Sequence, residues 1–410
     1  MKISDLNINS LIYLERYVNN GSPSGFTTKF TTSKGTSPFD LDVFFHPLIC
    51  EAPKRFFKTY GYIPEITELN IDDDKGWIVV HPDMQDENIF KNEFIKLYES
   101  SDIKLVPTAS GRTLMLINSS VKGYFKVHYS GIIGRIKRDL THKKAISGPE
   151  ISELFINLIN QKKLDKRLTL LPETGSRTFI NKEQKKEWGM IWRSFEPYNF
   201  NELETPYLVP FFSLFGKDRL NPNHPTLLEQ IIEKKSVSPV KYIVDSLILP
   251  LIECYFSVLT NAGIQPEWHA QNLLLTLDKN FNPVQFVMRD LESMDKDITL
   301  IKQLNLNINF KSSPFKCIDE TQYNYYIKHS FMYDYKLGEY ILQPLIDFLV
   351  ETYSAKPFEI TKTIKAFVKP LLNQLPNNFF PKHWYVFESV LIDQSKKERP
   401  YVELSNPKFR

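Results

Sequence analysis

The segment from Gln265 to Asp290 constrains the fold of this chain most, because it joins a strand hairpin to a dense set of polar side chains. Its apolar runs, Leu273–Leu277 and Phe286–Met288, are typical of buried strands, and Asp278–Pro283 between them has turn-forming residues. We therefore predict a hairpin that carries polar groups at its ends. These groups are Glu267, His269, Gln271, Asn272, Arg289 and Asp290.

The polar groups of this hairpin predict a nucleotide and metal site. Glu267, Asn272 and Asp290 offer hard oxygen atoms, which suit Mg²⁺ better than zinc. His269 offers a cationic or hydrogen-bonding contact for phosphate. The alternative interpretation is a structural hairpin with a core histidine whose hydrogen bonds are satisfied.

The composition predicts a folded globular protein. At 410 residues the chain is long enough for two or three domains. A hydrophobic fraction of 42% and an aromatic fraction of 13% are typical of a globular rather than a disordered chain. The net charge is only +3, so no polyanionic partner is implied and we do not expect nucleic-acid binding.

The cysteines and the N-terminus predict a cytoplasmic protein. Cys50, Cys254 and Cys317 are widely separated, odd in number and without metal-type pairing, as is typical of reduced thiols in the cytosol. Residues 1–7 contain no sustained apolar stretch, and no run reaches the roughly 18 apolar residues of a membrane span. We therefore expect neither export nor membrane insertion.

A second group of candidate residues lies upstream, where small and basic residues border apolar strands. Ser110, Arg112 and Thr113 offer hydroxyls and a guanidinium that could hold a triphosphate, although alone they indicate an ordinary turn. Lys126 is the sharper candidate, because it lies within the apolar strand Gly123–Tyr129, where an unpaired buried charge would be costly.

Two further basic groups follow these residues. Arg193 ends the apolar strand Trp188–Arg193, much as Lys126 lies in its own strand. Arg135 and Lys137 alternate with apolar residues, and a solvated face is our expectation for them.

Apolar periodicity predicts several helices and a change of composition near residues 200–225. Strand-like patterns dominate before this region and helical patterns after it. The longest helix, Val240–Ala262, is expected to be kinked by Pro250 and stopped by Gly263. The other predicted helices are residues 6–17, 86–99, 149–164 with Pro149 in the first turn, 340–352 and 360–375.

Taken in order, these motifs resemble the NRPS-independent siderophore synthetases, the aerobactin-synthetase-like family called IucA/IucC. The strongest match is Glu267-Trp-His-Ala-Gln-Asn272 followed by Arg289-Asp290, which is similar to that family's Glu-Ala-His-x-Gln-Asn and Arg-Asp motifs. Weaker matches occur in the family's order at His46-Pro47, Lys54, Tyr62 to Glu65, His81-Pro82, Gln85, Ser110, Arg112, Thr113, Lys126, Arg138, Arg193, Pro381-Lys382 and Asn406-Pro407.

The resemblance implies a ligase that uses ATP and Mg²⁺. Such an enzyme activates a carboxylate as an acyl-adenylate and passes the acyl group to an amine or hydroxyl, releasing AMP and pyrophosphate. The implied Mg²⁺ ligands are Glu267, Asn272 and Asp290. The residues implied to face the carboxylate substrate are Arg138, His269 and Lys382. Those implied to contact ATP or offset its charge are Ser110, Arg112, Thr113, Lys126, Arg193, His269 and Gln271.

The resemblance also implies an α+β fold shaped like a cupped hand. Residues 44–205 would form strand-rich fingers and residues 206–410 a mainly helical palm, with ATP between them. Residues 1–43 would form an N-terminal arm, in place of a thumb that is mostly missing. The chain departs from the family pattern at His81-Pro-Asp-Met-Gln85, one residue longer than His-Pro-Trp-Gln, and at Gly134, where a hydroxyl residue is expected.

Two other functions stay open on the sequence alone. A kinase-like phosphotransferase also combines a histidine and an asparagine with a later aspartate, but residues 269–272 contain no aspartate to act as base. A shortened family member could bind a nucleotide, a siderophore or a protein partner without turnover. The sequence identifies neither the acid, citrate-like or another polycarboxylate, nor the nucleophile, and it leaves open whether the chain forms a homodimer.

Overall fold

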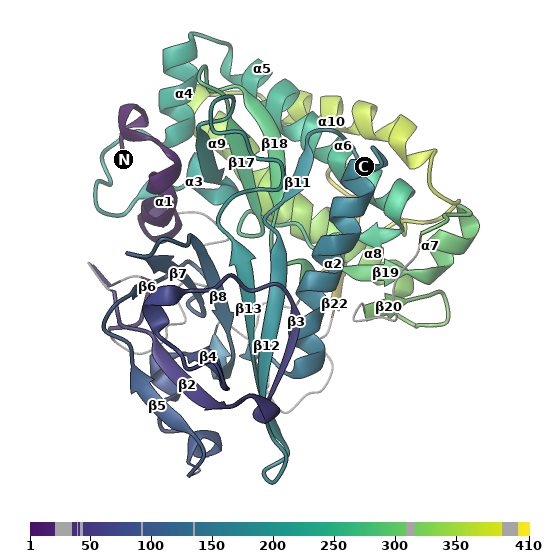
Figure 1. Cartoon of the computed structure of the whole chain (residues 1–410). Coiled ribbons are helices and arrows are strands. Elements are labelled where there is room, and N and C mark those ends of the chain that lie inside the picture. Colours follow the sequence, from purple (N-terminus) through teal and green to yellow (C-terminus); the bar gives the residue numbers. More distant parts are fainter. Residues whose placement is uncertain are drawn as a thin grey trace.

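The computed structural model describes residues 1–20, 35–38, 40–41, 44–91, 93–133, 136–308, 316–387 and 401–410. It has an α+β fold in which one half is built mainly of strands and the other holds most of the helices together with smaller sheets (Figure 1). This confirms the predicted fold class. The predicted limits of arm, fingers and palm stay predictions, and of the arm residues 21–34, 39 and 42–43 lie outside the described residues.

The strand half is built around two antiparallel sheets that share one core. The larger sheet has six strands, in the order β3 (Phe57–Gly61), β12 (Glu173–Asn181), β13 (Lys186–Ser194), β8 (Gly123–Val127), β7 (Thr113–Ile117) and β6 (Lys104–Pro107). The smaller sheet has three strands, in the order β4 (Lys75–Val80), β2 (Leu48–Pro53) and β5 (Lys96–Glu99). Buried side chains from both sheets, such as Ile49, Val79 and Phe125, pack together between them.

The predicted hairpin forms the centre of a separate four-stranded sheet. Strands β17 (Leu273–Leu277) and β18 (Pro283–Met288) pair antiparallel, which confirms the hairpin. Strand β14 (Tyr207–Pro210) pairs with β17, and β11 (Leu168–Leu170) runs parallel to β18. Strand β11 precedes residue 205, so it belongs to the first half of the sequence. The hairpin is therefore paired with a strand from that first half.

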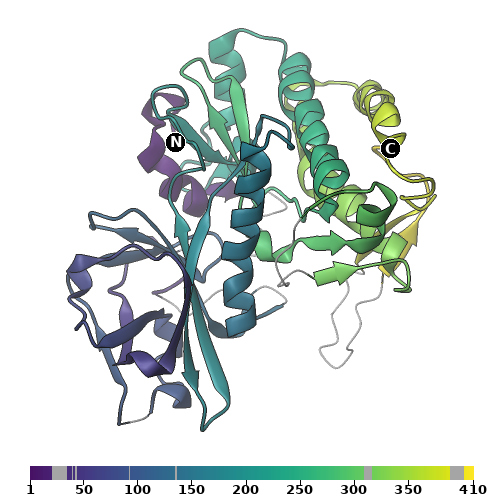
Figure 2. The ribbon, with the colours of Figure 1, turned by 45° about the vertical axis from the view of Figure 1, so that its right-hand side comes forward.

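Helices enclose this sheet and fill the second half of the molecule. Helix α2 (His142–Asn160) stands between the long strands β12 and β13 and the other helices (Figure 2). The remaining helices are α1 (Leu11–Tyr17), α3 (Phe211–Phe215), α4 (Leu227–Lys235), α5 (Pro239–Ile243), α6 (Leu249–Ala262), α7 (Ile298–Gln303), α8 (Tyr325–Ser330), α9 (Gln343–Tyr353) and α10 (Pro357–Leu372).

The predicted long helix is present as α5, a π-helical stretch Val244–Ile248, and α6. Pro250 lies in the first turn of α6, directly after the π-helical stretch. The helix ends at Gly263, whose φ of +58° favours glycine, and an added Cβ there would lie 2.2 Å from the Ile301 side chain. Both the helix and its stop are therefore as predicted.

This helix also corrects the expectation that no segment is long and apolar enough for a membrane. Residues Pro239–Ala262 pass that test by length and composition alone. Most of the helix, however, is buried inside the protein, where Leu247, Leu251 and Tyr255 belong to the largest hydrophobic cluster. This packing is that of a core helix in a soluble protein.

Two helix predictions were wrong in detail. Residues 86–99 contain a short 3₁₀ turn, Asn88–Phe90, and then strand β5, because pairing with β2 outweighs the local helical pattern. Helix α2 starts seven residues before Pro149, which lies inside it. Burial of Ala145 against Leu140 and Ile191 extends the helix beyond the start that proline predicts.

Candidate functional site

The predicted basic residues project from one face of the six-stranded sheet. On β8, Phe125 and Val127 point into the core between the sheets, so Lys126 points to the opposite face. Arg193 lies on the neighbouring strand β13, opposite Tyr124. The side chains of Lys126 and Arg193 are each only 3% exposed, so both charges need partners.

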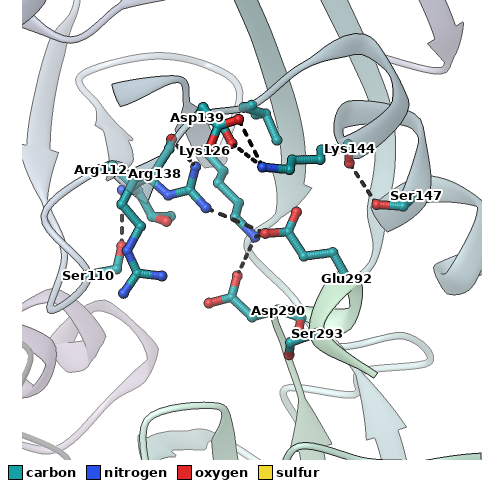
Figure 3. A network of polar contacts seen from close by, with 12 residues as sticks. Ser110, Arg112, Lys126, Arg138, Asp139, Lys144, Ser147, Asp290, Glu292 and Ser293 are labelled. Atoms are coloured by element: carbon teal, nitrogen blue, oxygen red, sulfur yellow. Dashed lines mark hydrogen bonds and ion pairs between the residues drawn. The ribbon is translucent and has the colours of Figure 1, made fainter. Parts of the chain in front are cut away.

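Those partners come from the end of the predicted hairpin. Asp290 follows β18 at a φ of +60°, and its carboxylate lies 2.9 Å from the Lys126 ammonium (Figure 3). The same carboxylate is within bonding contact of Arg193. Glu292, two residues further on, lies 3.0 Å from Lys126 and 3.4 Å from Arg112. The fold thus brings the upstream cations onto the acids of the hairpin.

These contacts shift the pKa values of the acids. Burial alone would raise the pKa of Asp290, but the positive charges of Lys126 and Arg193 hold it well below its usual range. Burial would also raise the pKa of Glu292, but the positive charges of Lys126 and Arg112 lower it. Both carboxylates are therefore ionised at neutral pH and available to cations.

The turn that contains Ser110, Arg112 and Thr113 lies at the edge of this cluster. The Ser110 hydroxyl accepts a hydrogen bond from the Thr113 amide at 3.1 Å, and Gly111 between them has a φ of +76°. Arg112 donates to the backbone oxygen of Arg138 at 2.8 Å, besides its contact with Glu292. In this arrangement the three residues build the turn and position Arg138.

Arg138 lies beside the acids, and its Nε donates to the Ile133 carbonyl at 3.2 Å. Figure 3 places its guanidinium on the Ser110 side of the cluster. Burial and the neighbouring Arg112 lower the pKa of Arg138, while Asp290 and Glu292 oppose that shift. A second anion near this guanidinium would therefore be stabilised.

The loop before the hairpin carries the remaining predicted ligands. The carboxylate of Glu267 lies 2.6 Å from the ammonium of Lys336, and the Asn272 side chain donates to the Glu267 carbonyl at 3.4 Å. Burial would raise the pKa of Glu267, but Lys336 and His269 lower it. Trp268, between Glu267 and His269 in the sequence, is fully buried against Tyr255. This contact anchors the loop to the helical core.

His269 is partly exposed in the same loop. Burial, followed by the charge of Lys336, lowers the pKa of His269 to about 4. The imidazole is thus neutral at pH 7. Of the two roles predicted for it, this favours the hydrogen-bonding contact over the cationic one.

Gln271 and Lys382 differ in their placement. The carbonyl of Gln271 accepts a hydrogen bond from the Arg289 Nε at 2.6 Å, so Gln271 belongs to the loop of the site. Lys382 is exposed in the segment before β21 (Trp384–Phe387). No hydrogen bond or ion pair joins it to the cluster within the described part of the chain, so its predicted contact with the substrate is not supported by this geometry.

Three acidic or basic residues of the site did not emerge from the sequence. Glu292 is two residues beyond Asp290, and that short spacing was a usable signal. Lys336 lies in a π-helical stretch, Phe331–Leu342, and Glu173 at the start of β12 bonds to Arg193. Neither had a sequence signal, since both reach the site only through the tertiary fold.

The oxygen donors at this site have the chemistry that Mg²⁺ prefers, since Glu267, Asn272 and Asp290 supply carboxylate and amide oxygens. Among the described residues, no group of three or more His, Cys, Asp and Glu side chains is arranged to hold a metal ion. Each carboxylate is instead paired with lysine or arginine. The predicted ligand set therefore fits in donor type, and its geometry stays a prediction.

Comparison with known proteins gives a match to one family over part of the chain. Residues 54–215 match the profile of the IucA / IucC family. The ATP-bound aerobactin synthetase IucA from a hypervirulent pathotype of Klebsiella pneumoniae has a similar structure, with a TM-score of 0.69 at 14% identity over 90% of this chain and 71% of that one. Residues 54–215 are thus similar to the IucA / IucC family, and most of the chain has the fold of an aerobactin synthetase.

Other solved structures are also similar to this chain. The petrobactin biosynthesis protein AsbB from Bacillus anthracis str. Sterne has a TM-score of 0.68 at 19% identity, over 89% of this chain and 68% of that one. Aerobactin synthetase IucC from the same Klebsiella pathotype has a TM-score of 0.64 at 11% identity, over 83% and 65%. At such identities the likeness establishes the fold.

A second profile matches the later part of the chain. Residues 240–374 match the ferric iron reductase FhuF-like transporter profile. This segment contains α6, the 267–272 loop and the hairpin. No curated protein matches the sequence.

Proposed function

We propose that this protein is an ATP-dependent siderophore synthetase of the IucA / IucC type, which adenylates a carboxylic acid and condenses it with an amine or hydroxyl. The observation that carries the proposal is the junction of Lys126 and Arg193 with Asp290, which comes from the other half of the chain. Such a junction combines cations for a triphosphate with oxygens for its metal. The similar fold of an ATP-bound synthetase supports the nucleotide assignment.

The cations serve the first chemical step. A carboxylate oxygen attacks the α-phosphorus of ATP, a bond to the acid forms, and the bond to pyrophosphate breaks. Two anions must approach each other, so positive charge at the reacting phosphate lowers the barrier. Lys126 and Arg193 on the six-stranded sheet, with Arg112 in the turn before β7, would supply that charge.

Mg²⁺, when bound, would offset the charge of the phosphate oxygens, held by Glu267, Asn272 and Asp290 with Glu292 close by. In the second step the amine or hydroxyl attacks the acyl carbon and AMP leaves. The neutral imidazole of His269 donates a hydrogen bond to an anionic oxygen without adding charge. We assign the substrate carboxylate to the guanidinium of Arg138, which lies beside the Lys126, Asp290 and Glu292 contacts.

The proposal also covers the surroundings of the reaction. We expect the protein to act in the cytoplasm, where ATP is available and where Cys50, Cys254 and Cys317 stay reduced. The substrates are small molecules, a citrate-like or other polycarboxylate and an amine or hydroxyl nucleophile. No nucleic acid or membrane is required.

Two other functions have a specific observation in their favour. The FhuF-like match suggests iron reduction. An iron–sulfur cluster for that reaction would usually take four cysteine ligands, and the whole chain has three cysteines. The altered acid-side motifs around His81 and Gly134 suggest a family member that binds without turnover. Carboxylate-dependent release of pyrophosphate separates the synthetase from both.

The experiment is a screen for pyrophosphate and AMP. Citrate, succinate and 2-oxoglutarate are each combined with diamines, hydroxamates or amino acids in the presence of ATP and Mg²⁺. We expect one acid to give pyrophosphate and Lys126→Ala to abolish the signal. Lys235→Ala, which removes the last lysine of α4 and its surface contact with the β17–β18 turn, should keep it. ADP as the only nucleotide product, or equal activity of Lys126→Ala and wild type, would contradict the proposal.

A further inference from the structure

The N-terminal helix α1 carries a buried carboxylate that faces the site. Glu15 is 1% exposed, and its two oxygens bond to both terminal nitrogens of the Arg289 guanidinium, one of them at 3.3 Å. The two residues are 274 positions apart. A two-pronged contact of this kind fixes the plane of the guanidinium as well as its position.

Arg289 uses its other groups to hold the 267–272 loop. Its Nε donates to the Gln271 carbonyl at 2.6 Å, and its backbone amide donates to the Asn272 carbonyl at 3.0 Å. The Asn272 amide in turn donates to the His269 carbonyl at 2.9 Å. A shift of the guanidinium would therefore move the backbone that carries His269, Gln271 and Asn272.

The charge of Arg289 requires this partner. Its side chain is 8% exposed, and Glu15 is the acid that pairs with it in the described part of the chain. A buried guanidinium without a carboxylate would seek another anion or water, and the neighbouring Asp290 is the nearest acid in sequence. Loss of Glu15 would thus disturb both the 267–272 loop before β17 and Asp290 after β18.

Helix α1 is anchored by contacts that do not involve the site. Leu11 packs with Leu274 and Val287 in a small hydrophobic cluster. The Tyr13 hydroxyl donates to Asp218 at about 3 Å, with 3.0 Å and 2.9 Å to its two oxygens. The position of Glu15 is therefore set by the fold and not by Arg289 alone.

We propose that Glu15 is a positioning residue, which holds Arg289 and through it the loop that carries His269, Gln271 and Asn272. The N-terminal helix is then a working part of the nucleotide site. The role of this loop in ATP binding rests on the proposed function. The clamp itself does not, because it follows from the contacts of Glu15 and Arg289.

The test compares Glu15→Gln and Glu15→Asp with Tyr13→Phe, a variant on the same helix that loses a hydrogen bond away from the site. Hydrogen exchange is measured for peptides covering residues 266–275, with peptides of α9 and α10 as reporters of global unfolding. We expect Glu15→Gln to speed exchange in the loop about 10-fold or more, Glu15→Asp less, and Tyr13→Phe not at all. Exchange that rises equally in α9 and α10, or that stays unchanged in the loop, would overturn the clamp.

A kinetic measurement completes the test. We expect Glu15→Gln to raise the KM for ATP about 10- to 100-fold with a smaller change in kcat, because a misplaced loop loses nucleotide contacts. A KM equal to that of Tyr13→Phe would overturn the role in nucleotide binding. If the wild type forms no AMP and pyrophosphate, the proposed function fails, while the exchange data still decide whether Glu15 holds the loop.

Discussion

The ammonium of Lys126 lies 2.9 Å from the carboxylate of Asp290, although 164 positions separate the two residues in the sequence. One comes from the centre of the six-stranded sheet and the other from the end of the hairpin. Arg193 shares the same carboxylate. The candidate site is therefore formed by groups from both halves of the chain.

Asp290→Asn should destabilise the protein. The substitution leaves Lys126 and Arg193 buried without their shared acid, and breaking a buried ion pair costs about 3 kcal/mol or more. Urea denaturation at pH 7 measures the change in the free energy of unfolding. The control is Glu339→Gln, which removes an exposed partner of Lys408 and should cost under about 1 kcal/mol. Equal effects of the two variants would contradict the network.

Glu292→Gln should lower turnover without weakening ATP binding. The amide keeps the shape of the side chain but removes the charge that holds Lys126 and Arg112, so both cations stay available to phosphate. We expect kcat to fall about 10-fold or more, since their placement is no longer fixed. Steady-state kinetics with varied ATP measure this. A raised KM for ATP with unchanged kcat would refute this role for Glu292.

Those parts of the candidate site that have a local sequence pattern could be predicted from the sequence. The β17–β18 hairpin followed from its apolar runs and turn residues, and Lys126 followed from the cost of a charge in an apolar strand. Glu15 and Lys336 could not be found in this way, because each reaches the site from a distant helix. Their roles depend on tertiary packing, which no local pattern encodes.

The errors in the fold have the same physical origin. Strand β5 was predicted as part of a helix, since its four residues carry too little pattern to outweigh the surrounding apolar spacing. Its partner β2, more than 40 positions upstream, decides its conformation. Helix α2 likewise passes through Pro149 because its buried face continues on both sides of the proline.

Gly148→Ala should disturb the support of Arg193. A Cβ at this position of α2 would lie 1.8 Å from a carboxylate oxygen of Glu173, the second acid that bonds to Arg193. The carboxylate must move, and we expect a loss of about 1–3 kcal/mol in the free energy of unfolding. Thermal unfolding detects it, with Lys143→Ala on the exposed side of the same helix as the control. Unchanged stability of Gly148→Ala would mean that Glu173 adapts without cost.

The stability of the fold should fall as the pH decreases from about 6.5 to about 4. Burial lowers the pKa of His81 and of His128 to about 4, and that of His269 falls to about 4 as well. The unfolded chain binds protons below about pH 6.5 that the folded protein does not, so protonation favours unfolding in this window.

For His81 and His128, which are both buried, the shift corresponds to about 3 kcal/mol each. Urea denaturation between pH 4.5 and 8 tests this. His128→Gln should flatten the pH dependence of the unfolding free energy relative to wild type, whatever its effect at pH 8. An identical pH profile in this variant would show that His128 titrates normally in the folded state.

The central claim is the formation of an acyl-adenylate at the junction of Lys126 and Asp290, and isotope transfer tests it most directly. The acid found in the pyrophosphate screen is labelled with ¹⁸O in its carboxylate and incubated with ATP, Mg²⁺ and the amine. Adenylation passes one carboxylate oxygen to the phosphate of AMP, so mass spectrometry should find one ¹⁸O in AMP for each product formed. Label in inorganic phosphate together with ADP, or AMP without ¹⁸O, would contradict the account.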